Sequence, residues 1–190
     1  MDFPEINTDR LVLREIGFED QDSIFEIFSN ENVVKYYDLE AFSERKQSLK
    51  LIEFFKNRYE SSVGIRWGIV LKGNKKCIGT CGFNSWSMPM HSGVIGYDLN
   101  SQYWGKGIVT EAVNSILSLA YSGGLSCGVL NRIQADTVPG NIASEKVLQK
   151  LGFREEGIRR QSGYWKGKYH DLKCFSLLKE EFADNIEKVF

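Results

Sequence analysis

The stretch Leu99-Asn-Ser-Gln-Tyr-Trp-Gly-Lys-Gly-Ile-Val-Thr110 decides the fold. The apolar run Gly93–Leu99 before it predicts a strand, and the periodic apolar residues of Gly105–Tyr121 predict a long helix after it. The first N–H groups of a helix have no acceptor within the helix, and they lie at the positive end of its dipole. Gly105 and Gly107 allow the backbone to come close to a phosphate. The stretch therefore predicts a turn that holds a diphosphate at the start of a helix.

Two common phosphate loops do not fit this stretch. The Walker pattern requires G-x-x-x-x-G-K-[ST], which is not present here. The dinucleotide fingerprint requires G-x-G-x-x-G, and Ile108-Val-Thr110 follow Gly107 where the third glycine is needed. Taken alone, the stretch is also compatible with a tight strand-to-helix turn that binds nothing.

The rest of the chain alternates between strand and helix patterns. Ser43 is expected to cap a helix, Gly152 to end one, and Ser85–Met90 to form an exposed aromatic loop. The order of the elements predicts a mixed α/β sheet. The expected strands are Leu11–Arg14, Arg66–Leu71, Cys77–Phe83, Arg132–Val138, Arg154–Gln161 and Tyr169–Leu178, and the expected helices are Phe18–Ser29, Ser43–Tyr59, Asn141–Leu151 and Lys179–Val189.

Composition narrows the class of protein. The 190 residues favour one domain spanning residues 1–190, and a net charge of −1 argues against nucleic acid or an anionic membrane as partner. The four cysteines and two histidines are not spaced as metal ligands, so no metal is expected. The N-terminus lacks a basic segment followed by an apolar run. We therefore expect a cytosolic protein with free thiols.

Several motifs together resemble one known family. Gln102-Tyr-Trp-Gly-Lys-Gly107 is similar to Q/R-x-x-G-x-G/A, the acetyl-CoA motif of the GNAT acetyltransferase superfamily. Thr8–Arg14, Ile78–Gly82, Asn141–Phe153 and Gly163–Gly167 resemble, in the same order, segments of its bacterial ribosomal-protein N-terminal acetyltransferase branch. The resemblance implies an α/β (α+β) fold with a GNAT-like, mixed, mostly antiparallel central sheet flanked by helices.

The resemblance also implies which residues bind the coenzyme. The backbone of Gly105, Lys106, Gly107, Ile108, Val109 and Thr110 would hold the pyrophosphate after the motif residue Gln102. The backbone of Tyr97 and Leu99 would bind the pantetheine arm, and a strand N–H near Leu99 would stabilise the oxyanion. Asn141 would contact the coenzyme near its reactive end, and it is equally suited to cap a helix.

The catalytic residues are less clear from the sequence. The family's usual tyrosine acid is replaced by Leu148, so the resemblance implies Ser144 as the acid or as a donor to sulfur. The family's glutamate base is replaced by Val94, which leaves Asp98 as the nearest carboxylate. Water, His91, Asn84 and Tyr97 remain alternatives for accepting the amine proton.

The predicted activity is acetyl transfer from acetyl-CoA to a primary amine, with a protein N-terminal amine among the candidates. An antibiotic, a polyamine or another metabolite is an alternative acceptor, and a CoA-binding protein without turnover is an alternative function. Aromatic residues are expected on the acceptor side: Tyr36, Tyr37, Trp67, Phe83, Trp86, Tyr164 and Trp165. A homodimer is compatible with the exposed aromatic loop but is not required by the sequence.

Overall fold

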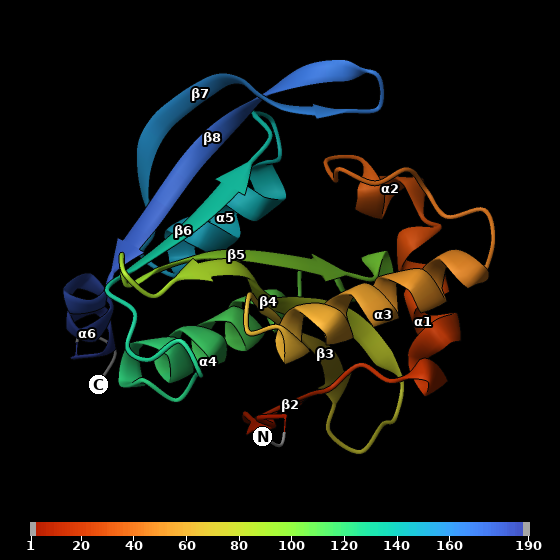
Figure 1. Ribbon diagram of the computed structural model, residues 1–190, viewed down its shortest axis with the longest axis horizontal. Coiled ribbons are helices and arrows are strands. Elements are labelled where there is room, and N and C mark those ends of the chain that lie inside the picture. Colours follow the sequence, from red (N-terminus) through yellow and green to blue (C-terminus); the bar gives the residue numbers. More distant parts are fainter. Residues whose placement is uncertain (1–2, 188–190) are drawn as a thin grey trace.

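The computed structural model describes residues 3–187 of the chain. Its framework is one eight-stranded sheet (Figure 1). The strand order is β1-β2-β3-β4-β5-β6-β8-β7, and every neighbouring pair is antiparallel except β5 and β6, which are parallel. The strands are β1 (Ile6–Asn7), β2 (Leu11–Arg14), β3 (Ile65–Leu71), β4 (Cys77–Ser87), β5 (Ser92–Leu99), β6 (Arg132–Thr137), β7 (Arg154–Trp165) and β8 (Lys168–Leu178). The mixed, mostly antiparallel sheet predicted from the sequence is confirmed.

The parallel contact between β5 and β6 is short. Ser92, Gly93 and Val94 pair with Arg132–Gln134, and within the described residues the pairing extends no further. Beyond that point the two strands diverge, so that β6, β8 and β7 stand apart from the β1–β5 part of the sheet (Figure 1). The edge of β5 from Ile95 to Leu99 is therefore left without a strand partner on the β6 side.

Helices cover both faces of the sheet. Adjacent residues of a strand point to opposite faces, and Cys77 and Ile78 of β4 accordingly pack into two different hydrophobic clusters. One cluster contains α4, and the other contains α1 and α3. The helical elements are η1 (Phe18–Asp20), α1 (Gln21–Phe28), α2 (Glu31–Val34), α3 (Lys46–Glu60), η2 (Ser101–Tyr103), α4 (Ile108–Ser122), α5 (Ile142–Lys150) and α6 (Lys179–Glu187). In residues 3–187, no helix combines the length and apolar character needed to cross a membrane.

The long helix after the decisive stretch is confirmed, with a later start. Helix α4 begins at Ile108 because Gly105 and Gly107 adopt left-handed conformations, with φ of 74° and 73°. Its buried side chains recur at the helical period and pack against β4 and β5: Ile108, Ala112, Val113, Ile116, Leu117, Ala120 and Tyr121. Gly123, with φ of 83°, ends it in the same left-handed conformation.

Other predicted boundaries were wrong or incomplete. Ser43 does not cap α3, because the N–H groups of Ser43 and Glu44 both donate to Oε1 of Gln47, and the helix begins only at Lys46. The prediction of a loop over Ser85–Met90 is wrong for its first half, because β4 continues to Ser87. Helix α2 was not predicted, and the last two residues of the predicted terminal helix lie outside the described residues.

A buried ion pair links the three central strands. Arg66 of β3 donates to Asp98 of β5 at 2.8 Å, and their side chains are 4% and 2% exposed. Thr80 of β4 lies between them, accepting from Arg66 Nε at 2.7 Å and donating its hydroxyl to Asp98 at 2.6 Å. The backbone N–H of Thr80 donates to the second oxygen of Asp98. Protein groups on three strands thus compensate both charges.

We expect Asp98→Ala to destabilise the fold by about 3–5 kcal/mol, because it leaves the buried Arg66 cation without its counter-charge. Urea denaturation measures the change. Asp22→Ala is the matched control: Asp22 pairs with Arg45 through side chains that are 71% and 63% exposed, so its loss should cost no more than about 0.5 kcal/mol. Equal, small effects of the two substitutions would contradict this role of the ion pair.

Candidate active site

Two cavities meet where β5 and β6 diverge. The first, called here the α4 cavity, has a volume of about 1060 Å³ and lies between the end of β5, the turn before α4, and α5. The second, called the α3 cavity, has a volume of about 820 Å³ and lies between α3, β4, β5 and β6. The two share one set of lining residues: Tyr36, Tyr37, Tyr97, Asn141 and Ser144. These shared residues form the junction between the cavities.

The turn before α4 presents unpaired backbone donors to the α4 cavity. Within the part of the chain that the structure describes, the N–H groups from Gly105 to Thr110 have no protein acceptor. A Cβ on Gly105 would meet no atom within 4 Å, so the space over the turn is open. The N-terminus of a 15-residue helix lies directly behind it. Unpaired amides at the start of a helix are suited to binding an anion, and a diphosphate at this turn stays a prediction.

Arg10 holds this turn from behind. Its Nη1 donates to the carbonyl of Lys106 at 3.0 Å, and its Nε forms an ion pair with Glu111 at 2.6 Å. The Thr8 hydroxyl donates to the other oxygen of Glu111 at 2.6 Å. Burial opposes ionisation of Glu111, but the hydrogen bonds from Thr8 and Arg10 outweigh it and lower the pKa of this carboxyl. Glu111 is therefore charged, and it fixes Arg10 against the turn.

Most of the predicted coenzyme residues lie around the α4 cavity. Gln102 and Lys106 do not line it. The Lys106 side chain instead donates from Nζ to the Gln102 carbonyl at 3.0 Å and lies over the Tyr103 ring. The carbonyl of Leu99 accepts from the indole of Trp104 at 2.8 Å, which leaves the N–H of Leu99 as its available group. The predicted residues in the lining are Tyr97, Leu99, Gly105, Gly107, Ile108, Val109, Thr110 and Asn141.

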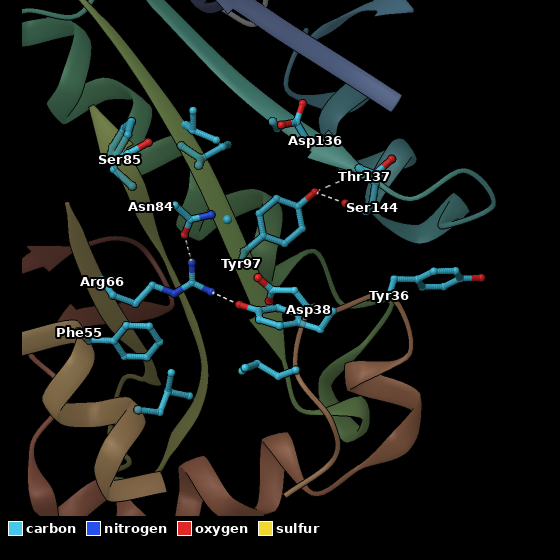
Figure 2. Close-up of a pocket in the computed structure, with 18 of the residues that line it drawn as sticks. Tyr36, Asp38, Phe55, Arg66, Asn84, Ser85, Tyr97, Asp136, Thr137 and Ser144 are labelled. Atoms are coloured by element: carbon cyan, nitrogen blue, oxygen red, sulfur yellow. Dashed lines mark hydrogen bonds between the residues drawn. The ribbon is translucent and has the colours of Figure 1, made fainter. Parts of the chain in front are cut away.

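Ser144 and Tyr97 are in direct contact at the junction. Tyr97 Oη lies 2.6 Å from Ser144 Oγ and donates to the Ser144 carbonyl at 3.3 Å (Figure 2). Burial raises the pKa of Tyr97 to about 12, although the bond to Ser144 opposes this shift. The phenol therefore keeps its proton at neutral pH. Asn141 caps α5 by accepting from the N–H of Ser144, which confirms its predicted capping role and fixes the first turn of the helix.

One face of α3 lines the α3 cavity. Its lining residues recur at the helical period: Gln47, Lys50, Leu51, Phe54, Phe55 and Arg58. Four of the predicted acceptor-side aromatics, Tyr36, Tyr37, Phe83 and Trp165, also line it. Trp67 instead belongs to the core, Trp86 donates its indole N–H to the Ser62 carbonyl, and Tyr164 packs on Tyr169 outside the lining.

The carboxylates near the junction differ in how far they are engaged. Both oxygens of Asp98 accept hydrogen bonds from Arg66 or Thr80, so this side chain is poorly placed to accept a substrate proton. Asp38 and Asp136, which the sequence reading missed, line the α3 cavity. Within residues 3–187, Asp38 has no recorded ion-pair or hydrogen-bond partner. An acidic residue directly after Tyr36-Tyr37 was the signal that could have found it.

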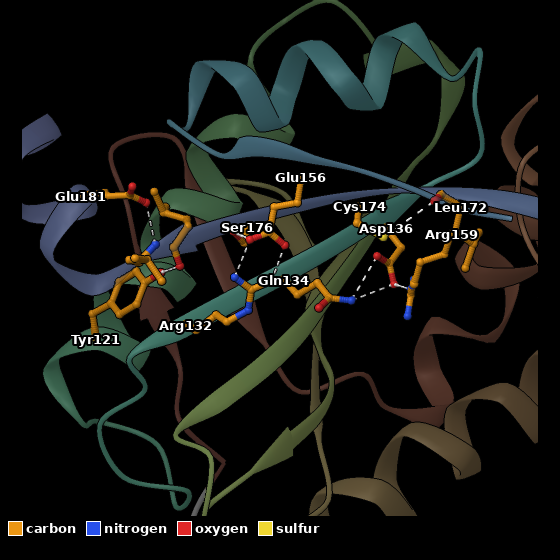
Figure 3. Close-up of polar contacts among 12 residues, drawn as sticks. Tyr121, Arg132, Gln134, Asp136, Glu156, Arg159, Leu172, Cys174, Ser176 and Glu181 are labelled. Carbon is orange, nitrogen blue, oxygen red and sulfur yellow. Dashed lines mark hydrogen bonds and ion pairs between the residues drawn. The ribbon is translucent and has the colours of Figure 1, made fainter. Parts of the chain in front are cut away.

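Asp136 belongs to a polar network on the separated part of the sheet (Figure 3). It accepts from Gln134 Nε2 at 3.1 Å and from Arg159 Nη2 at 2.5 Å. Further along, Glu156 pairs with Arg132, and the hydrogen bond from Arg132 is the main reason that the pKa of Glu156 falls to about 2. These contacts link β7 to β6 and β8 on the separated part of the sheet.

The described part of the chain contains no group of three residues arranged to hold a metal ion. His91 lies in the turn between β4 and β5, where its ring contacts the Val129 carbonyl outside both cavities. His170 stacks on Trp165 with ring centroids 4.1 Å apart. The side chains of the junction therefore offer the hydroxyls of its tyrosines and of Ser144 and the amide of Asn141.

Comparison with known proteins gives a consistent picture. The family model described as an acetyltransferase (GNAT) domain matches residues 10–154. An uncharacterised N-acetyltransferase of Bacillus subtilis (strain 168), YoaA, is 37% identical over 177 residues, which cover 93% of this chain and 98% of the relative.

Solved structures share the fold. A ribosomal-protein-S5-alanine acetyltransferase from Vibrio fischeri has a TM-score of 0.78 and 25% identity over 94% of this chain and 98% of its own. The microcin C7 self-immunity acetyltransferase MccE, solved in complex with acetyl-CoA and AMP, has a TM-score of 0.80 and 23% identity over 90% and 93%. The likeness to MccE concerns the fold alone.

We expect Gly107→Asp to weaken acetyl-CoA binding at least about 100-fold, because a carboxylate beside the turn would repel the pyrophosphate. Isothermal titration calorimetry measures the affinity. Gly73→Asp is the matched control, because Gly73 also has a left-handed φ, of 80°, and its Cβ would meet no atom within 4 Å, where a Cβ on Gly107 would lie 3.6 Å from Arg10 Nη2. Both variants carry similar backbone strain. A folded Gly107→Asp protein with unchanged affinity would exclude this turn as the pyrophosphate site.

Proposed function

The chain belongs to the GNAT family of acetyltransferases and is an acetyl-CoA-dependent N-acetyltransferase, and on this basis we propose that it acetylates a primary amine bound in the α3 cavity. A protein N-terminal amine is the leading acceptor. The observation that carries the proposal is the junction at Tyr97 and Ser144, where the cavity beside the phosphate-binding turn opens into a second cavity suited to an acceptor.

The α4 cavity fits acetyl-CoA. The unpaired amides from Gly105 to Thr110 would bind the pyrophosphate, and the free edge of β5 would bind the pantetheine arm through backbone groups. The N–H of Leu99 is the donor best placed to stabilise negative charge on the acyl oxygen, because the carbonyl of this residue is already occupied by Trp104. When bound, acetyl-CoA supplies an activated acyl group as a thioester.

Ser144 and Tyr97 would supply the proton for the leaving sulfur. Ser144 Oγ would donate its proton to the departing thiolate as Tyr97 Oη, 2.6 Å away, passes its own proton to Ser144. The Tyr97 phenolate that this leaves would regain a proton from solvent once the thiol departs, and the raised pKa of Tyr97 favours that return. The pair replaces the tyrosine that other members of the family carry where this chain has the fully buried Leu148.

The acceptor amine must lose a proton on the other side of the junction. Asp38 is the better candidate to receive it, because its carboxylate is exposed in the α3 cavity and has no recorded partner among the described residues. Asp136 is engaged by Gln134 and Arg159. Asp98, which the sequence favoured, would serve catalysis only by holding Arg66 and the central strands in place.

A small-molecule amine is the second candidate acceptor. The volume of the α3 cavity, about 820 Å³, lies in the range of pockets for drug-sized ligands, and its aromatic lining suits such a ligand.

A cytosolic location and a homodimer remain parts of the proposal. The four free, buried cysteines fit a reducing compartment, and the exposed Tyr164–Tyr169 pair offers a surface for a second subunit.

We expect thiol release from acetyl-CoA in the presence of peptides with free N-terminal amines, and slower release with polyamines and aminoglycosides. The measurement is a thiol-release assay across such a panel, with the Gly107→Asp protein as the coenzyme-binding control. Preferred turnover of a small amine would favour the second candidate. Tight binding of acetyl-CoA without turnover of any amine would contradict the proposed reaction.

We expect Ser144→Ala to lower kcat by about 100-fold, the lower end of the range for general acids, with little change in acetyl-CoA affinity. Tyr97→Phe should lower kcat by about 10-fold, because it removes one hydrogen-bond partner of Ser144. The double variant should be no slower than Ser144→Ala, since the two groups act in series. Additive losses would show that Tyr97 and Ser144 act independently.

A further inference from the structure

Asn84 lies at a bulge in the wall of the α3 cavity. Phe83 pairs with Ile95 and Ser85 pairs with Val94, so Asn84 is the extra residue of β4 and has no partner on β5. A bulge turns the side chain of the extra residue away from the regular alternation of the strand. The Asn84 side chain lines the α3 cavity beside Arg66 (Figure 2).

Two arginines fix the orientation of Asn84. The side-chain oxygen accepts from Arg66 Nη1 at 3.2 Å, and the backbone carbonyl accepts from Arg58 Nη2. Because a guanidinium can only donate, the oxygen of the Asn84 amide must face Arg66 and its nitrogen must face elsewhere. Within residues 3–187, the Asn84 Nδ2 group has no recorded acceptor.

Gly96 keeps these donors uncovered. A Cβ on Gly96 would lie 2.8 Å from Asn84 Nδ2 and 3.0 Å from Arg66 Nη1. The φ of Gly96 is not in the left-handed region, so its backbone does not require glycine. The missing side chain instead leaves room above the floor of the cavity, where Gly96 is itself a lining residue.

The free N–H groups of the resulting subsite are donors, and the one acceptor beside them, the Asn84 side-chain oxygen, is engaged by Arg66. Arg66 uses its Nε on Thr80 and its Nη2 on Asp98 and Tyr37, which leaves one N–H of Nη1 without a recorded acceptor in the described residues. Asn84 Nδ2 adds two more N–H groups. Such a group of donors, with the Arg66 charge already balanced by Asp98, suits a neutral oxygen acceptor such as a carbonyl.

This subsite shares a cavity with the proposed reacting centre. Asn84, Arg66 and Gly96 line the α3 cavity together with Tyr97 and Ser144, and Gly96 directly precedes Tyr97 in β5. In a compound with an amine on the carbon next to a carbonyl, the nitrogen and the oxygen are separated by only two carbons, or about 3 Å. Such a compound brings an oxygen for the donors of Asn84 and Arg66 into the cavity together with its amine.

We infer that Asn84 and Arg66 bind the carbonyl oxygen of an α-amino carbonyl acceptor, such as the first residue of a peptide or an amino-acid amide. The inference rests on the proposed acetylation of an amine in the α3 cavity, and it narrows the acceptor class. Polyamines and simple alkylamines have no oxygen to occupy this subsite.

The test compares L-alaninamide with isopropylamine, which lacks the carboxamide. Asn84→Asp keeps the size of the side chain and the contact with Arg66, but it replaces the Nδ2 donors by a second acceptor oxygen. We expect the ratio of kcat/KM for alaninamide to that for isopropylamine to fall about 10- to 100-fold in this variant, mainly through the KM for alaninamide. The KM for acetyl-CoA should not change.

Asn57→Asp is the matched control, because it makes the same chemical change on α3 at an exposed position outside the lining of both cavities. It should leave the ratio unchanged, and thermal unfolding checks that both variants are folded. An unchanged ratio in Asn84→Asp would overturn the carbonyl subsite while leaving the acetyltransferase proposal intact. Failure of the unsubstituted enzyme to acetylate either amine, with acetyl-CoA still bound, would overturn both.

Discussion

The short parallel contact between β5 and β6 is the constraint on which the site depends. Only Ser92–Val94 and Arg132–Gln134 pair, and beyond them the two strands separate, β5 packing against α4 and β6 against α5. If the pairing continued, the edge of β5 would be occupied and the α3 and α4 cavities could not meet. The same divergence brings Tyr97 of β5 beside Ser144 of α5, the helix that follows β6 in the chain.

Arg66 connects the stability of this frame with its chemistry. Its guanidinium holds β3, β4 and β5 together through Thr80 and Asp98, and it orients Asn84 in the α3 cavity. A buried charge in this environment is stabilising only when every partner is in place. The partners lie on two neighbouring strands, β4 and β5, and on the segment after α2, which carries Tyr37. The geometry of the α3 cavity is therefore tied to the integrity of the central sheet.

The sequence predicted the local features well and the long-range contacts poorly. The turn around Gly105 and Gly107, the apolar face of α4 and the Asn141 cap all follow from neighbouring residues, so they could be recognised directly. The Tyr97–Ser144 contact joins residues 47 positions apart, and only the fold brings them together. Asp98 was favoured as a base because its ion pair with Arg66, 32 positions away, is not visible in the sequence. The bond from the Lys106 amine to the Gln102 carbonyl is a side-chain contact that the sequence did not indicate.

The contacts that Thr8 and Arg10 make behind the turn affect how the coenzyme site is assembled. Thr8 and Arg10 contact Glu111, which follows about a hundred positions later, so the turn is fixed by a segment that is synthesised well before it. Those residues must wait until Glu111 has been synthesised, and closing so large a loop costs entropy before any contact rewards it. A chain that contains the entire glycine motif without the contacts of Thr8 and Arg10 would thus lack a preorganised turn.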